Sequence, residues 1–182
     1  MQDRAAAQAD LRQAHVNGGT GVVVSGLAWL ATGLVWLSAG PVSAFVTLFI
    51  AGMAIAPLAG LVERFGFKVP ASGPGRRLEW IAIVTVPLIL GGFFIAWRWF
   101  GISAPQAIPI VAVGVGLRYL AFPLMYGDWR FLALGGVFVA LGGWAYAGGA
   151  VPAGNVAVIL GLIELALGFL LCSTWRKPMT QT

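Results

Sequence analysis

The sequence predicts an all-α fold, a polytopic membrane helix bundle of six transmembrane helices. Of the 182 residues, 59% are hydrophobic and only 9% are charged, whereas soluble domains contain about 25% charged residues. The hydrophobic residues also gather into six stretches, each close to the roughly 20 residues that a helix needs to cross a bilayer. We place these spans near residues 20–38, 41–62, 78–99, 105–126, 131–149 and 152–174.

The spans make up one transmembrane domain over residues 20–175, and the length leaves no room for a separate soluble domain. Residues 1–19 are polar and alanine-rich, which predicts a short cytosolic helix or a frayed tail that ends at residues 17–19. We expect no cleavable signal peptide, because no short apolar stretch with a cleavage site follows the start. Residues 176–182 are expected to form a cytosolic C-terminal tail, and His15 is expected to be solvated.

The second, fourth and sixth spans begin close to Pro41, Pro105 and Pro152. Proline suits the first turn of a helix, where its missing N–H would have no partner. The distance from each proline to the next charged segment is similar, so the spans could form three helical hairpins. That regularity reflects either a duplication or the requirement that every span have the same length.

Charge placement predicts the orientation of the bundle. Lys and Arg favour the cytoplasmic side of a membrane. They cluster in the segments before the first span, between the second and third, between the fourth and fifth, and after the sixth. The residues are Arg4, Arg12, Arg64, Lys68, Arg76, Arg77, Arg130, Arg176 and Lys177. Both termini are therefore expected in the cytoplasm. The net charge of +5 is then explained by topology, which favours anionic lipid headgroups over nucleic acid as partners.

Arg118 and Glu164 are the charges that lie well inside predicted spans. They follow the prolines of the fourth and sixth spans by 13 and 12 residues. At about 1.5 Å per residue, both Cα atoms lie at roughly equal depth in the bilayer. We expect the two side chains to form a buried ion pair. The pair either fixes helix register or acts as a substrate anchor or working carboxylate.

Small residues line the faces that carry these charges, as expected where membrane helices approach closely. Tyr119 and Tyr126 share one face of the fourth span and complete a candidate binding site with Arg118 and Glu164. The stripes are Ala157, Gly161, Glu164 and Gly168, and Gly114, Arg118 and Ala121. Similar ladders occur at Gly52, Ala56 and Gly60 and at Gly136 and Ala140. Most of these should pack within the chain, and one could serve a homo-oligomer.

No catalytic signature is present in the sequence. It lacks the zinc-protease, nucleophile-elbow and phosphate-loop motifs. The chain has one histidine, His15, and one cysteine, Cys172, so no intrachain disulfide and no Cys/His metal cluster can form. We therefore expect a non-enzymatic protein without a metal or cofactor. The sequence favours a small transporter-like or solute-binding membrane protein of unknown ligand. The alternative is a structural or stress-associated membrane protein in which the charged pair only stabilises helix packing.

The fourth span and its exit read VGVGLRYLAFPLMYGDWRFLALGG. Its Arg118-Tyr119 and Tyr126-Gly127 pairs resemble an uncharacterised family of small bacterial six-span integral membrane proteins, a domain of unknown function. The stretch from Ala56 to Ala59 is also similar. The resemblance implies a location in the bacterial cytoplasmic membrane and supplies no activity.

Overall fold

The computed structural model describes residues 2–69, 73–149 and 151–175, and the regular elements in these ranges are all helical. Four helical stretches are long and apolar enough to cross a membrane: Val16–Phe67, Pro74–Trp99, Ala104–Tyr126 and Ala153–Thr174. The main helices are α1 (Gln2–Ala14), α2 (Gly19–Leu61), α3 (Trp80–Val84), α4 (Val86–Trp99), α5 (Ala107–Tyr126), α6 (Arg130–Tyr146) and α7 (Ala153–Thr174).

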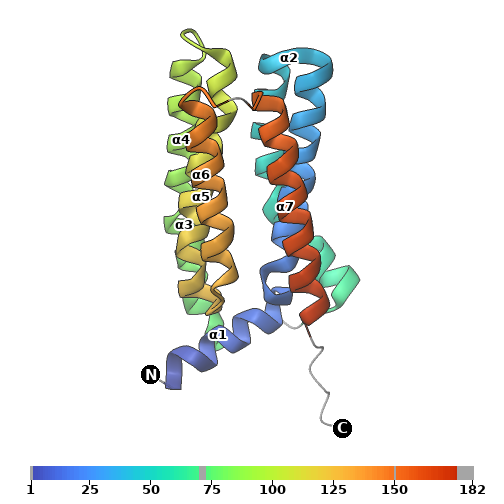
Figure 1. Ribbon diagram of the computed structural model, residues 1–182. Helices are drawn as coiled ribbons and strands as arrows, with labels where there is room; N and C mark the ends of the chain where they lie inside the picture. The colour runs from blue at the N-terminus through green and yellow to red at the C-terminus, as the bar shows by residue number, and fades with distance from the viewer. Residues whose placement is uncertain (1, 70–72, 150, 176–182) are drawn as a thin grey trace.

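Helix α1 lies across one end of the bundle, whereas the other helices run along its long axis (Figure 1). The polar start of the chain is therefore an ordered helix in the structure. It ends at Ala14, and the chain then turns upward into α2 through Asn17 and Gly18, whose φ angles are 57° and 77°. We name this end of the bundle the α1 end.

Helix α2 is two antiparallel arms joined at Gly40 (Figure 1). Gly40 has φ 79° and ψ −177°, a conformation that glycine alone adopts without steric cost. The first arm, residues 19–39, runs away from the α1 end, and the second arm, residues 41–61, returns to it. Pro41 starts the second arm, as the sequence predicts.

Helices α3 and α4 follow one path that is interrupted at Thr85. Pro87 lies just after the break and cannot donate a backbone hydrogen bond. At the same break, the Ile81 carbonyl accepts hydrogen bonds from the Thr85 hydroxyl at 2.9 Å and from the Thr85 amide at 3.2 Å. The predicted single span at 78–99 is therefore a broken helix.

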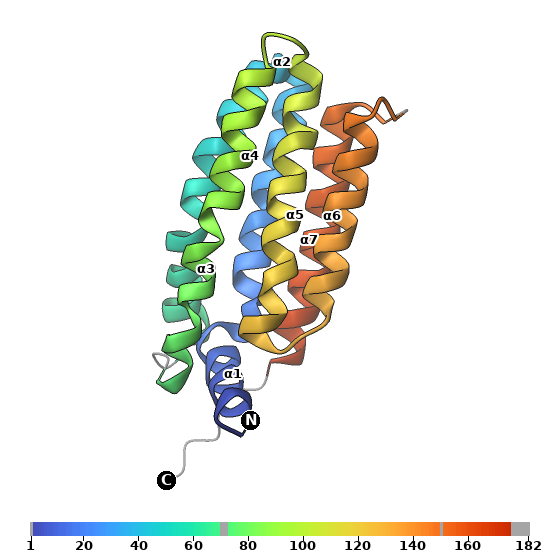
Figure 2. The same ribbon diagram turned by 90° about the vertical axis from the view of Figure 1, so that its left-hand side faces the viewer.

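The bundle has two halves (Figures 1 and 2). The arms of α2 and helix α7 form one half, and α3, α4, α5 and α6 form the other. Helix α7 packs along the first arm of α2 and makes far less contact with α6. The predicted hairpin of 131–149 with 152–174 therefore does not form a packed pair.

Glycines spaced by seven residues hold the α2–α7 contact together. A Cβ atom on Gly26 would lie 2.9 Å from the Gly161 carbonyl oxygen, and one on Gly161 would lie 2.8 Å from that of Gly26. The same close approach is found one heptad away on each side. The facing glycines are Gly19, Gly26 and Gly33 on α2, and Gly168, Gly161 and Gly154 on α7. Such small-residue seams let two helix backbones come into direct contact.

Candidate binding cavity between the two halves

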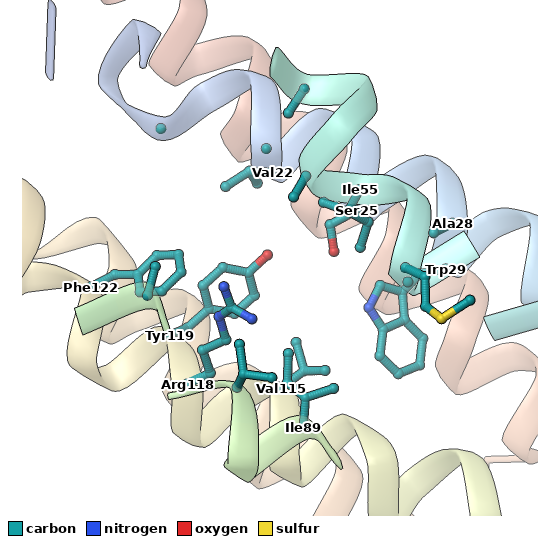
Figure 3. Close-up of a pocket in the computed structure, with 18 of the residues that line it drawn as sticks. Val22, Ser25, Ala28, Trp29, Ile55, Ile89, Val115, Arg118, Tyr119 and Phe122 are labelled. Carbon is teal, nitrogen blue, oxygen red and sulfur yellow. The ribbon is translucent and has the colours of Figure 1, made fainter. Parts of the chain in front are cut away.

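A cavity of about 530 Å³ lies between the two halves of the bundle (Figure 3). Both arms of α2 line one side of it, and α3, α4 and α5 line the other. Cavities of this size are typical of small-molecule sites, which occur between the helices of bundles. Most lining side chains are apolar.

Small residues on the second arm of α2 make room for the cavity. Gly52, Ala56 and Gly60 line it, and a Cβ atom added at Gly52 or Gly60 would meet no atom within 4 Å. The expectation that this ladder packs against another helix of the same chain is therefore wrong for these two glycines. The missing side-chain volume leaves open space where a neighbouring helix would otherwise pack.

Aromatic rings join the second arm to α4 and its C-terminal end, at the end of the cavity that lies away from the α1 end. Phe45 contacts the ring of Phe93 edge-on at 5.5 Å and that of Phe100 at 5.5 Å. Phe49 contacts Phe93 at 5.3 Å in the same manner. Edge-to-face pairs of this kind stabilise packing by about 0.5–1.5 kcal/mol beyond area burial. They hold the second arm beside α4 although the ladder of small residues leaves the middle open.

Arg118 extends from α5 into this cavity (Figure 3). Its guanidinium carbon lies 5.5 Å from the centre of the Phe122 ring, an arrangement typical of a cation–π contact. In residues 2–69, 73–149 and 151–175, Arg118 has no carboxylate partner within 4.0 Å. Its positive charge is thus left facing a largely apolar space.

The predicted ion pair between Arg118 and Glu164 does not form. Glu164 is fully buried, and its Oε1 atom accepts hydrogen bonds from Ser25 at 2.9 Å and from Tyr119 at 2.6 Å. Its Oε2 atom has no hydrogen-bond partner in the described part of the chain. The reason is the placement of α7, whose small-residue face packs against the first arm of α2 and so directs Glu164 toward Ser25. Equal spacing from the start of a span does not determine which helix a side chain faces.

The two tyrosines of the predicted site separate into different roles. The Tyr119 hydroxyl donates a hydrogen bond to Glu164, and the Tyr119 ring lines the cavity (Figure 3). Tyr126 also lines the cavity, nearer the α1 end, and stacks on Phe131 with ring centroids 5.2 Å apart. Arg118, Tyr119 and Tyr126 therefore share one cavity, and Glu164 lies behind its wall.

A polar cluster closes the α1 end of the cavity. The His15 ring nitrogens lie 3.1 Å from a Glu63 oxygen and 3.4 Å from a Glu79 oxygen. Thr20 donates a hydrogen bond to the other oxygen of Glu63. The expectation that His15 is merely solvated is therefore wrong.

The charge environment also changes the acidity of His15. Burial by itself lowers the pKa of His15, but hydrogen bonds and charge attraction from Glu63, and then from Glu79, outweigh it. The pKa of His15 is consequently raised above its ordinary value of 6.5. An ion pair of this kind could not be predicted from the sequence, because 48 residues separate His15 from Glu63.

Side chains on one face of helix α1 donate hydrogen bonds to the C-terminal end of α5. Arg12 donates to the Tyr126 carbonyl, and Gln8 donates to the Leu124 carbonyl at 3.1 Å. On another face, Asp10 accepts hydrogen bonds from the Gly73 and Gly75 amides, each at 2.8 Å. The carbonyls at the end of α5 would otherwise lack intrahelical partners. The i, i+4 spacing of Gln8 and Arg12 was the available sequence signal for this contact.

Within the described ranges, no group of three or more His, Cys, Asp or Glu residues could hold a metal ion. The cavity offers an apolar space with aromatic rings and the Arg118 guanidinium, and the His15–Glu63 pair lies at its α1 end.

Comparison with known proteins gives a family but no activity. No curated protein and no solved structure shows a significant match to the chain. A family model described as a family of unknown function (DUF7010) matches residues 5–174. Because that match covers nearly the whole chain, the protein belongs to this family of unknown function.

Proposed function

We propose that the chain is a multi-pass protein of a bacterial cytoplasmic membrane with six crossings. The supporting observations are the four apolar helical stretches and the reversal at Gly40 inside the first of them. With α6 counted as a further crossing, these give six. The cluster of basic residues at the α1 end favours a cytoplasmic location for that end, and hence for both termini.

Within that membrane, the protein binds a small molecule in the cavity between its two halves. The observation that carries this proposal is the position of Arg118, which enters a largely apolar cavity and has no carboxylate partner among the described residues. A charge near the middle of a bilayer costs about 2.5–3.5 kcal/mol on insertion scales. The cation–π contact with Phe122 offsets about 0.5–2 kcal/mol of this burial cost. A ligand that accepts hydrogen bonds from the guanidinium would offset the remainder, which fits a solute-binding or transporter-like protein.

A structural or stress-associated role is the second candidate, and the Glu164 hydrogen bonds favour it. Ser25 on α2, Tyr119 on α5 and Glu164 on α7 meet at one buried carboxyl group, so this cluster joins both halves of the bundle. In this alternative the cavity is a packing defect, and Arg118 contacts only lipid and water. Neither candidate includes a catalytic step.

Native mass spectrometry of the protein released from lipid nanodiscs tests ligand binding. We expect wild-type protein to retain a small molecule that Arg118→Met and Gly52→Leu lose. Leu at position 52 would fill open cavity space, because nothing lies within 4 Å of its Cβ position. Gly136→Leu is the matched control, since Gly136 is equally unobstructed but does not line the cavity. If all four proteins carry the same bound molecules, or none, the binding proposal is wrong.

A further inference from the structure

The rim of the cavity indicates the route by which a ligand arrives. Several lining residues are also exposed apolar side chains, among them Met53 at 64% and Leu90 at 53%. They lie on the second arm of α2 and on α4, midway along the bundle. The cavity therefore opens sideways, between two helices, onto the surface that the proposed orientation places against lipid. A ligand that enters by this route is itself lipid-soluble over most of its length.

The volume of the cavity suits a small molecule. At about 530 Å³ it lies within the range of about 300–1,000 Å³ that is typical of small-molecule sites.

The charges around the cavity select the head group. Arg118 presents one positive charge, and a planar carboxylate matches its guanidinium with two parallel hydrogen bonds. A phosphate monoester carries about −1.5 to −2 charges. One arginine would leave part of that charge uncompensated in an apolar space that also contains Glu63. His15, the other basic group on the lining, already contacts Glu63 and Glu79.

We infer that the cavity binds a long-chain carboxylate, a free fatty acid, with its head group on Arg118 and its chain along the apolar walls toward Met53 and Leu90. This inference rests on the proposed binding function and specifies the ligand class for it. Of the eight tryptophans, Trp29 alone lines the cavity, and it lies on the first arm across from Arg118 (Figure 3). Trp29 therefore reports on the chain of a bound ligand.

Fluorescence quenching by 12-bromododecanoate in nanodiscs provides the test. We expect saturable quenching in wild-type protein and its loss in Trp29→Phe, because bromine quenches tryptophan only at short range. Arg118→Met should raise the dissociation constant obtained from the saturable quenching about tenfold or more, as expected for loss of a charged hydrogen bond. The uncharged 12-bromododecanol should bind wild-type protein about tenfold more weakly than the acid and should be insensitive to Arg118→Met. Gly136→Leu should behave as wild type and show that the mutated proteins remain comparable.

Three results would overturn the inference. Equal quenching by the acid and the alcohol would show an apolar site without head-group selection. Saturable quenching of Trp29 by a brominated phospholipid would show a membrane lipid as the occupant. In both cases Gly52→Leu should still abolish binding, so the proposed binding function would survive while the ligand class is wrong. Absence of saturable quenching by every probe, together with no retained molecule in the mass spectra, would overturn both.

Discussion

At the scale of single residues, the fully buried carboxyl of Glu164 joins three helices. Two hydroxyl donors from two other helices converge on one of its oxygens. Interhelical hydrogen bonds in membranes average about 0.6 kcal/mol and reach about 1.7. Bonds to a buried carboxyl group should lie at the upper end of that range, because an unmet acceptor there has no water to replace the donor.

Tyr119→Phe removes one of these donors and should lower the free energy of unfolding by about 1–2 kcal/mol. Tyr126→Phe is the matched control, since Tyr126 is buried on the same helix without a hydrogen bond to Glu164. Its cost should be clearly smaller. Steric-trapping measurements in bicelles would give both values, and equal costs for the two variants would contradict the role assigned to Tyr119.

Arg118 and Glu164 should behave as independent residues. They share no hydrogen bond or ion pair in the described structure, so the effects of Arg118→Met and Glu164→Gln on unfolding should add within about 0.5 kcal/mol. Glu164→Gln and Tyr119→Phe, by contrast, should be strongly non-additive. Two double-mutant cycles measured in the same bicelles decide between the pairing expected from the sequence and the pairing in the structure.

This difference shows what the sequence can and cannot predict about the site. Hydropathy and the helical rise of about 1.5 Å per residue predict that both charges lie deep in the bundle. The small-residue stripes predict that the helix faces carrying them are buried. The partner of Glu164, however, depends on which helix α7 packs against. That choice is made by reciprocal backbone contacts such as Gly26 with Gly161, and hydropathy contains no information about it.

At the scale of helices, glycine serves two opposite purposes in this chain. On the α2–α7 seam it allows direct backbone contact, and on the second arm of α2 it leaves space unfilled. The two uses look identical in sequence, since both are small residues at helical spacing. Only the packing partner distinguishes them.

Gly26→Ala and Gly52→Ala should therefore have opposite effects. The new Cβ atom at position 26 would lie 2.9 Å from a backbone oxygen, which forces the helices apart and should cost about 1–3 kcal/mol. At position 52 the Cβ enters open space, and replacing glycine within a helix should stabilise the fold by up to about 1 kcal/mol. Unfolding measurements on both variants test this, and a destabilised Gly52→Ala would show that the second arm packs more closely than described.

His15, in the turn that follows α1, connects bundle stability to pH. The pKa of His15 is raised in the folded state. The contribution of its ion pairs to the free energy of unfolding is therefore fully present below the ordinary pKa of about 6.5. The contribution is lost as pH rises through the raised folded value. Thermal unfolding in detergent should therefore show a decreasing midpoint as pH increases through this window. His15 is the only histidine, so His15→Asn should remove most of that dependence, and an unchanged pH profile in the variant would contradict the assignment.

At the scale of the whole molecule, the helix ends were predictable to within a few residues, because composition changes sharply where each apolar stretch ends. The span expected at 105–126 is α5 at Ala107–Tyr126 in the structure, and the span expected at 152–174 is α7 at Ala153–Thr174. The arrangement of the helices into two halves, and the cavity between them, was not predictable. Both depend on contacts between residues far apart in the chain, such as Phe45 with Phe93.

Helix α6 decides whether the bundle has six crossings or five. It has 17 residues, about 25 Å of helix against a hydrocarbon core of about 30 Å. Local thinning of the bilayer or snorkelling flanks can accommodate such a deficit at a small cost per ångström. Arg130, at the start of α6, is paired with Asp128, and Trp129 and Trp144 near its two ends are exposed aromatic residues suited to the interfaces. We therefore expect α6 to cross.

Reporter fusions after residues 69, 127 and 175 should read cytoplasmic, and fusions after residues 102 and 148 should read external. Seven basic residues in the described ranges lie toward the α1 end and only Arg98 lies toward the other, so the positive-inside rule strongly favours this orientation.

A reversed pattern at every site would invert the bundle in the membrane but keep six crossings. If the sites at 127 and 148 give the same reading, α6 does not cross. The bundle would then contain five crossings, and the 175 fusion would read external.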